Sequence, residues 1–176
     1  MRYEENYIKS ALFEFQRYKT LGDKCFDQLT EQDLFWAYHS SDNSIAVIVK
    51  HLSGNMLSRW TNFLTEDGEK EWRNRETEFD NSFSSKQEVM QAREKGWACL
   101  FDALTSIQLD EFNKTIKIRN ESHTIFEAVN RQLAHYANHV GQIVLIAKMI
   151  KGEEWVSLSI AKGKSSEFNR KKFDKR

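Results

Sequence analysis

Residues 124–152 read TIFEAVNRQLAHYANHVGQIVLIAKMIKG, and this stretch predicts the fold class. Apolar residues recur through it at spacings of three and four, which is the periodicity of an amphipathic helix. Thr124 and Glu127 form a capping box, in which each side chain satisfies a backbone N–H group of the first turn. Gly152 is typical of the position just after a helix. The stretch therefore predicts a long helix that ends at about Lys151.

Three other stretches show the same helical periodicity, and their caps predict where two of them begin. A cluster of N-cap residues, Ser40–Asn43, precedes the second helix, and Ser85 with Glu88 forms another capping box before the third. Residues 65–84 are polar and aperiodic, which predicts a long connection anchored by its aromatic side chains Trp72, Phe79 and Phe83. Residues 115–119 alternate like a short strand. The three predicted helices span residues 3–29, 44–63 and 86–106.

Four long helices in one chain predict an all-α fold, a four-helix bundle with a long loop between its second and third helices. The composition agrees, because none of the 176 residues is proline, the commonest helix breaker. Hydrophobic residues make up 40% of the chain, as in a folded domain. We expect one domain over residues 1–161 and an irregular, basic C-terminal tail over residues 162–176.

The charge balance limits the partners that the chain can have. The 26 basic residues match 26 acidic ones, which argues against a global electrostatic fit to nucleic acid or to an anionic membrane. Residues 162–176 hold seven basic and two acidic residues, and such a tail either contacts RNA or an acidic partner or stays solvated. No apolar run exceeds five residues and the N-terminus carries acids, so we expect a soluble, cytoplasmic protein without a membrane span.

Three of the five histidines fall at positions that suit a metal ion. His135 and His139 lie four residues apart on the last predicted helix, so one ion can reach both imidazoles. His51 lies in the middle of the second helix, on a face that also carries apolar residues. The alternative is that these histidines are ordinary hydrogen-bonded side chains. Gly54 and Gly141 lie close to the histidines and are interpreted as points where helices approach closely.

The surroundings of the histidines favour an open site over a protease site. Position 136 is tyrosine, whereas a zinc protease of the H-E-x-x-H type has glutamate there, so this helix brings no general base. Three neutral imidazoles with a vacant fourth position are typical of catalytic metal sites. Asn55, Asn138 and Gln142 are candidates for groups that orient the ligands or the substrate.

The combination of Val-Lys-His51-Leu-Ser-Gly-Asn-Met with His135-x-x-x-His139-x-Gly-Gln-Ile resembles the DinB-like (YfiT-like) superfamily of four-helix bundles, over about residues 1–152. The stretches 51–64 and 158–163 are similar to a bacterial branch with no assigned activity. The resemblance implies a divalent metal ion, zinc or nickel, held by His51, His135 and His139. It also implies homodimers and, in some members, thiol-dependent transfer or isomerisation with bacillithiol or mycothiol.

Two functions of different classes follow. The first is a metal-dependent enzyme, a thiol S-transferase or a hydrolase, that acts on a small electrophile; the lack of a nearby carboxylate base fits a thiol co-substrate. The second is a non-catalytic bundle whose histidines bind metal for stability or not at all, and whose helix faces and basic tail serve a partner. Arg59 fits either as an anion clamp for a substrate or, with Trp60, as a contact between helices.

Overall fold

The computed structural model describes residues 2–174, and over this range the chain is mostly helical. The expected all-α character therefore holds broadly, with a small antiparallel sheet added. Two short 3-10 helices cover Leu109–Asn113 and Gly152–Glu154. The α-helices and strands are α1 (Tyr3–Phe26), α2 (Glu31–Phe35), α3 (Ile45–Trp60), α4 (Lys86–Ser106), β1 (Thr115–Ile118), β2 (Glu121–Thr124), α5 (Ile125–Lys151) and α6 (Ser165–Phe173).

The capping side chains explain where the long helices begin. The hydroxyls of Ser44, Ser85 and Thr124 accept hydrogen bonds from the N–H groups three residues on, so the predicted starts of α3, α4 and α5 are confirmed to within a residue. The ends are less well predicted, because α1 and α3 each stop three residues early. Helix α2 was not expected, since its five residues are too few to show a period.

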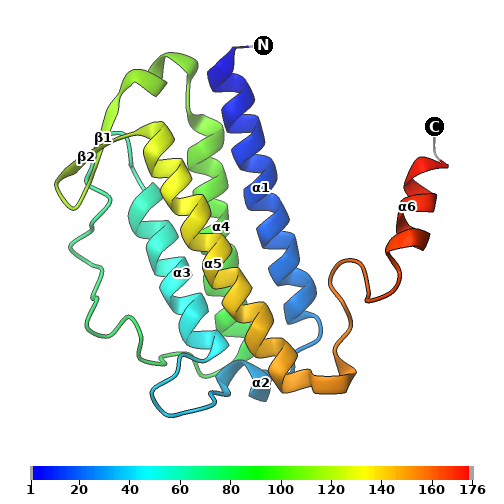
Figure 1. The fold of residues 1–176 in the computed structure, drawn as a ribbon. Coiled ribbons are helices and arrows are strands. Elements are labelled where there is room, and N and C mark those ends of the chain that lie inside the picture. Colours follow the sequence, from blue (N-terminus) through cyan, green and yellow to red (C-terminus); the bar gives the residue numbers. More distant parts are fainter. Residues whose placement is uncertain (1, 175–176) are drawn as a thin grey trace.

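Helices α1, α3, α4 and α5 lie side by side (Figure 1). The two helices α1 and α5 run in one direction, and α3 and α4 run in the other. Helix α3 packs against α4 and α5, and α1 packs against α5 and α4. Their apolar faces enclose one core, whose fully buried side chains include Phe15, Leu100, Leu104, Val129 and Tyr136.

The close approach of two helices occurs at Gly96 on α4, and the expectation for Gly54 and Gly141 is wrong. A Cβ at position 96 would lie 2.9 Å from the Cα of Ser53 on α3, closer than two carbon atoms can stand. A Cβ at position 54 or 141 would meet no atom of a neighbouring element within 4 Å. Glycine is therefore required on α4, where this helix crosses α3 at Ser53, two residues after His51.

The connection formed by residues 61–85 is long because α3 and α4 run the same way, so the chain must return along α3 before α4 begins (Figure 1). Of the expected aromatic anchors, Trp72 is wrong, because it is 58% exposed, whereas Phe79, although 51% exposed, stacks on the His51 ring and Phe83 packs against the core. The buried residues of the connection are instead mainly charged, Lys70, Arg73 and Glu78. Ion pairs and hydrogen bonds hold this segment in place, and its aperiodic sequence does not predict them.

The β1–β2 hairpin is fastened to the connection by one carboxylate. Arg119 and Asn120 adopt positive φ in the hairpin turn, and their N–H groups donate to Asp67 at 2.8 and 2.7 Å. The N–H of Gly68 donates to the carbonyl of Lys117 at 2.8 Å. These bonds fix the start of the connection against the end of the fold where α5 begins.

The end of the chain departs from the expected irregular tail, because residues 165–173 form α6. None of its residues is buried, and it stands apart from the long helices (Figure 1). Over the described part of the chain, no helix combines the length and the apolar character that crossing a bilayer requires.

Candidate metal centre

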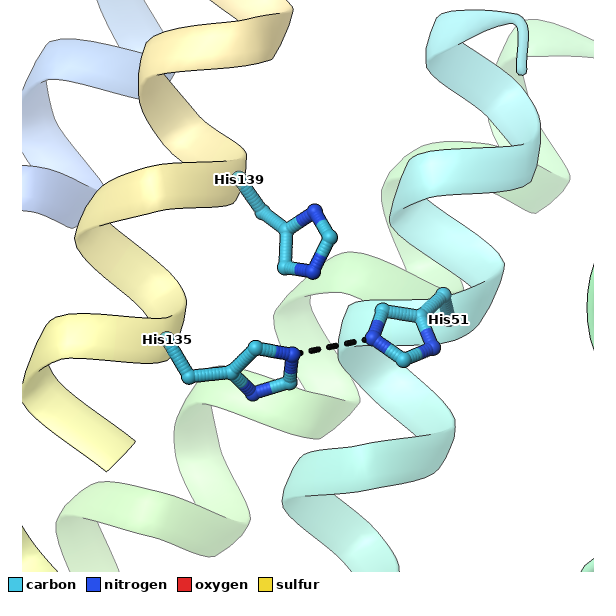
Figure 2. A group of neighbouring side chains, drawn as sticks. All are labelled: His51, His135 and His139. Carbon is cyan, nitrogen blue, oxygen red and sulfur yellow. Dashed lines mark hydrogen bonds between the residues drawn. The ribbon is translucent and has the colours of Figure 1, made fainter. Parts of the chain in front are cut away.

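His51, His135 and His139 are brought together at the contact between α3 and α5. Their side chains turn toward one another, one from α3 and two from successive turns of α5 (Figure 2). One nitrogen of each ring lies within 4.8 Å of one nitrogen of each of the others. The sequence prediction that these three residues converge is confirmed, and within residues 2–174 this is the one group of three or more His, Cys, Asp or Glu side chains with such a geometry.

The two nitrogens nearest each other are Nε2 of His51 and Nε2 of His135, 3.0 Å apart. Two nitrogens bound to one tetrahedral zinc ion at about 2.0–2.1 Å are roughly 3.3 Å apart. The third ring, His139, has its centroid 4.7 Å from both of the others. The group therefore needs only small side-chain rotations to place three nitrogens at bonding distance from a single ion.

A carboxylate that the sequence analysis missed lies behind His51. Nδ1 of His51 is 2.5 Å from Oε1 of Glu78, and Glu78 also accepts hydrogen bonds from Arg73. Glu78 belongs to the connection between α3 and α4, 27 residues after His51. The expectation that no carboxylate is near the histidines is wrong, although this one is already bonded on the far side of the His51 ring from His135.

His139 is held in a similar way from its own helix. Its Nδ1 lies 2.7 Å from Oε1 of Gln142, one turn further along α5. An amide oxygen only accepts, so His139 Nδ1 donates and Nε2 keeps its lone pair. Gln142 thus orients a histidine, as the sequence analysis expected of it.

Burial keeps the imidazoles of His51 and His135 in the neutral form that binds a metal ion. Burial lowers the pKa of His51, although Glu78 opposes this. Burial, together with the neighbouring His139, His51, Arg73 and Arg59, lowers the pKa of His135 to about 3. Both rings are therefore neutral at pH 7, which a ligand requires. Burial raises the pKa of Glu78, but Arg73 and His51 lower it by more than burial raises it. The pKa therefore lies below its ordinary value, and the carboxyl is ionised.

The other predicted site residues have partners away from the three rings or none. Asn55 is buried, and its Oδ1 accepts a hydrogen bond from the hydroxyl of Tyr136 at 3.1 Å. Arg59 is buried and donates to the carbonyl of Gly68 in the connection, with Glu69 3.5 Å away. Asn138 is exposed beside His139, with no hydrogen bond from its side chain to any residue in 2–174. Of these three residues, Asn138 alone is exposed.

The predicted role of Trp60 as a helix contact is confirmed, because its Nε1 donates to the Tyr136 hydroxyl at 3.2 Å, from α3 to α5.

The two cysteines lie outside the histidine group. Cys25 is fully buried, and burial raises the pKa of its thiol to about 12, so it is a core residue. Cys99 lies 3.6 Å from the Thr61 hydroxyl.

The model of one protein family, described as "Protein of unknown function (DUF1572)", matches residues 2–164. The chain belongs to this family. The DUF1572 match includes every element from α1 to the turn before α6, and with them His51, His135, His139 and Glu78. A comparison with curated proteins gave no match.

The donor set fits a divalent ion of the zinc type. Imidazole nitrogen suits zinc, nickel, copper and iron and is a poor ligand for magnesium or calcium, which prefer oxygen. His51 is buried, whereas His135 and His139 are half-buried, so the group is closed on the α3 side and partly open on the α5 side. Such a group could hold an ion and leave it accessible to a small molecule.

Proposed function

We propose that the protein binds one divalent metal ion through His51, His135 and His139 and uses it to act on a small molecule. The convergence of the three imidazole nitrogens within 4.8 Å is the observation that carries this proposal. Two of these imidazoles, those of His51 and His135, share one hydrogen bond, and protonated rings so close together would repel one another. A metal ion bound by all three nitrogens would account for their convergence.

The metal that fits best is zinc or nickel. Both accept three imidazoles, and both leave at least one position for another ligand. When bound, such an ion lowers the pKa of a water or thiol in that position and polarises an electrophile. We therefore propose a thiol S-transferase, using a low-molecular-weight thiol of the bacillithiol kind, or a hydrolase.

The substrate proposal has support from a cavity whose wall includes Gln142, the hydrogen-bond partner of His139. A cavity of about 320 Å³ lies between the α2–α3 connection and the last turns of α5, with Trp36, Ile48, Gln142, Ile146 and Met149 in its wall. Gln142 links it to the site, since the same side chain bonds His139. Its mostly apolar wall and modest volume suit a small molecule with an apolar part. The polar side chains in its wall that could orient such a molecule are Asp42, Asn43 and Gln142.

We also infer the finer class of the fold, a DinB-like four-helix bundle over residues 1–161 followed by the basic tail. In favour of it are the contacts of α1, α3, α4 and α5 around one core and the placement of the three histidines on two of these helices. We also propose that the protein is cytoplasmic. From the resemblance of its histidine motifs to the DinB-like superfamily we propose that it forms a homodimer, which sedimentation of the purified chain would test.

The test is metal analysis of the natively purified protein, followed by activity assays. We expect zinc or nickel near one equivalent per chain, and transfer of a thiol to an activated nitrobenzene, or hydrolysis of an ester, by the metal-loaded protein. Metal with no activity toward any thiol or water would favour the second function, a non-catalytic metal-binding bundle. Absence of metal, with none taken up on reconstitution, would refute the proposal.

A further inference from the structure

The pair formed by Glu78 and Arg73 is the most deeply buried ion pair in the connection between α3 and α4. Glu78 is 5% exposed and Arg73 is 8% exposed. Arg73 donates through both Nε and Nη2, and Arg75 adds a third positive group with its Nη1 3.8 Å from Oε2 of Glu78. Burying a charged pair costs desolvation energy, and this cost is offset only where the two groups are well aligned and their remaining polar atoms are hydrogen-bonded.

We infer that Glu78 is a positioning residue of the metal centre, which accepts the Nδ1–H of His51 and so keeps Nε2 of His51 as the free lone pair toward His135 and His139. The inference rests on the proposed function, because it requires a metal ion at the three histidines. It assigns a role in the centre to a segment, residues 73–80, that lies outside both histidine-bearing helices.

The hydrogen-bond chemistry leaves one choice for His51. An ionised carboxylate has no proton to give, so the 2.5 Å contact requires that Nδ1 of His51 donates to Glu78. A neutral imidazole with its proton on Nδ1 has a bare Nε2, which here accepts the Nε2–H of His135 at 3.0 Å. Arg73 donates to both carboxylate oxygens, Oε1 and Oε2, and so holds Glu78 against the His51 ring.

The rest of the segment is bound to the same turn of α3. Lys50 donates from Nζ to the carbonyls of Thr77 and Asp80, at 2.7 and 2.8 Å. Phe79 stacks on the His51 ring, with centroids 5.0 Å apart and planes 21° from parallel. The orientation of His51 is therefore coupled to the folding of residues 77–80, and metal binding should stabilise that segment in return.

The first test measures zinc affinity by competition with a chromophoric chelator for the wild type and for Glu78→Gln. We expect the variant to bind about 10–100-fold more weakly, as is typical when the partner of a metal-bound histidine is changed. The matched control is Glu69→Gln, which removes a charge from the same connection, where Glu69 pairs with Arg75 and contacts no histidine. Its affinity should stay within twofold of wild type.

Equal affinities for Glu78→Gln and wild type would overturn the inference, and so would an equal loss in Glu69→Gln. A wild-type protein that binds no zinc would instead refute the proposed function, so the two failures are distinguishable.

A second measurement distinguishes a positioning role from a merely structural one. Its result for the wild type does not depend on whether the variant folds. Long-range ¹⁵N–¹H spectra of the metal-free wild type should show His51 protonated at Nδ1 alone. In Glu78→Gln, the Nε2-protonated form should become populated while far-UV circular dichroism is unchanged. His51 protonated at Nε2 in the wild type would contradict the inference without recourse to any variant.

Discussion

At the scale of single residues, one missing methyl group at position 96 sets how closely α4 approaches α3. Gly96→Ala puts a Cβ 2.9 Å from the backbone of Ser53 and 3.2 Å from Sδ of Met56, so the helices must separate. We expect a loss of about 1–3 kcal/mol in the free energy of unfolding, since this overpacking outweighs alanine's better helix propensity. Urea denaturation measures it.

Gly141→Ala is the matched control, because Gly141 also lies inside a helix but its Cβ would meet nothing within 4 Å. This change should raise the free energy of unfolding by about 0.5–1 kcal/mol. Destabilisation of similar size in both variants would show that helix contact is not what position 96 requires.

Tyr136 makes the second prediction at this scale. Its hydroxyl is fully buried between Nε1 of Trp60, which donates to it, and Oδ1 of Asn55, which accepts from it. Tyr136→Phe leaves both partners buried and unsatisfied, so we expect it to lower the free energy of unfolding by about 1–3 kcal/mol. Thermal and urea unfolding check this, and zinc affinity should change little because Tyr136 bonds none of the three histidines. A stability equal to wild type would contradict the assignment.

At the scale of elements, the connection between α3 and α4 is held by carboxylates that titrate in acid. Hydrogen bonds from Arg75, together with Arg119 and the charge of Arg59, lower the pKa of Glu69 to about 2 although burial opposes this. A carboxyl whose pKa is lower when folded stabilises the protein above its ordinary value of 4.5, and the contribution is lost as pH falls toward 2.

We therefore expect the free energy of unfolding to fall between about pH 5 and pH 2.5, and to fall less steeply in Glu69→Gln, which has no such group to protonate. Urea denaturation at several pH values provides the measurement. Parallel pH profiles for wild type and variant would contradict a contribution from Glu69.

This connection is also where sequence reasoning reached its limit. The starts of α4 and α5 follow from Ser85 and Thr124 because capping is local, and the pairing of His135 with His139 follows because spacing on a helix is local. The position of His51 opposite them depends instead on how α3 packs against α5. The hydrogen bond between His51 and Glu78 joins residues 27 positions apart, and neither helical periodicity nor a capping motif predicts it. Gly96 was missed for the same reason, since only the packed partner shows which glycine of several is the crossing point.

At the scale of the whole molecule, α6 contributes no buried residue to the body of the protein. Removing residues 162–176 should therefore change the melting temperature by no more than about 2 °C, and zinc affinity should be unaffected. Calorimetry of the shortened chain tests the expected boundary of the domain at residue 161. A large drop in melting temperature would place the tail within the folded unit.

The central claim is that three histidines from two helices form one metal centre, and calorimetric titration of the metal-free protein with zinc tests it most directly. The account predicts one ion per chain in the wild type, loss of that binding in His135→Ala, and its retention in His39→Ala, where the exposed His39 lies outside the group. No binding by the wild type, or equal binding by wild type and His135→Ala, would contradict it.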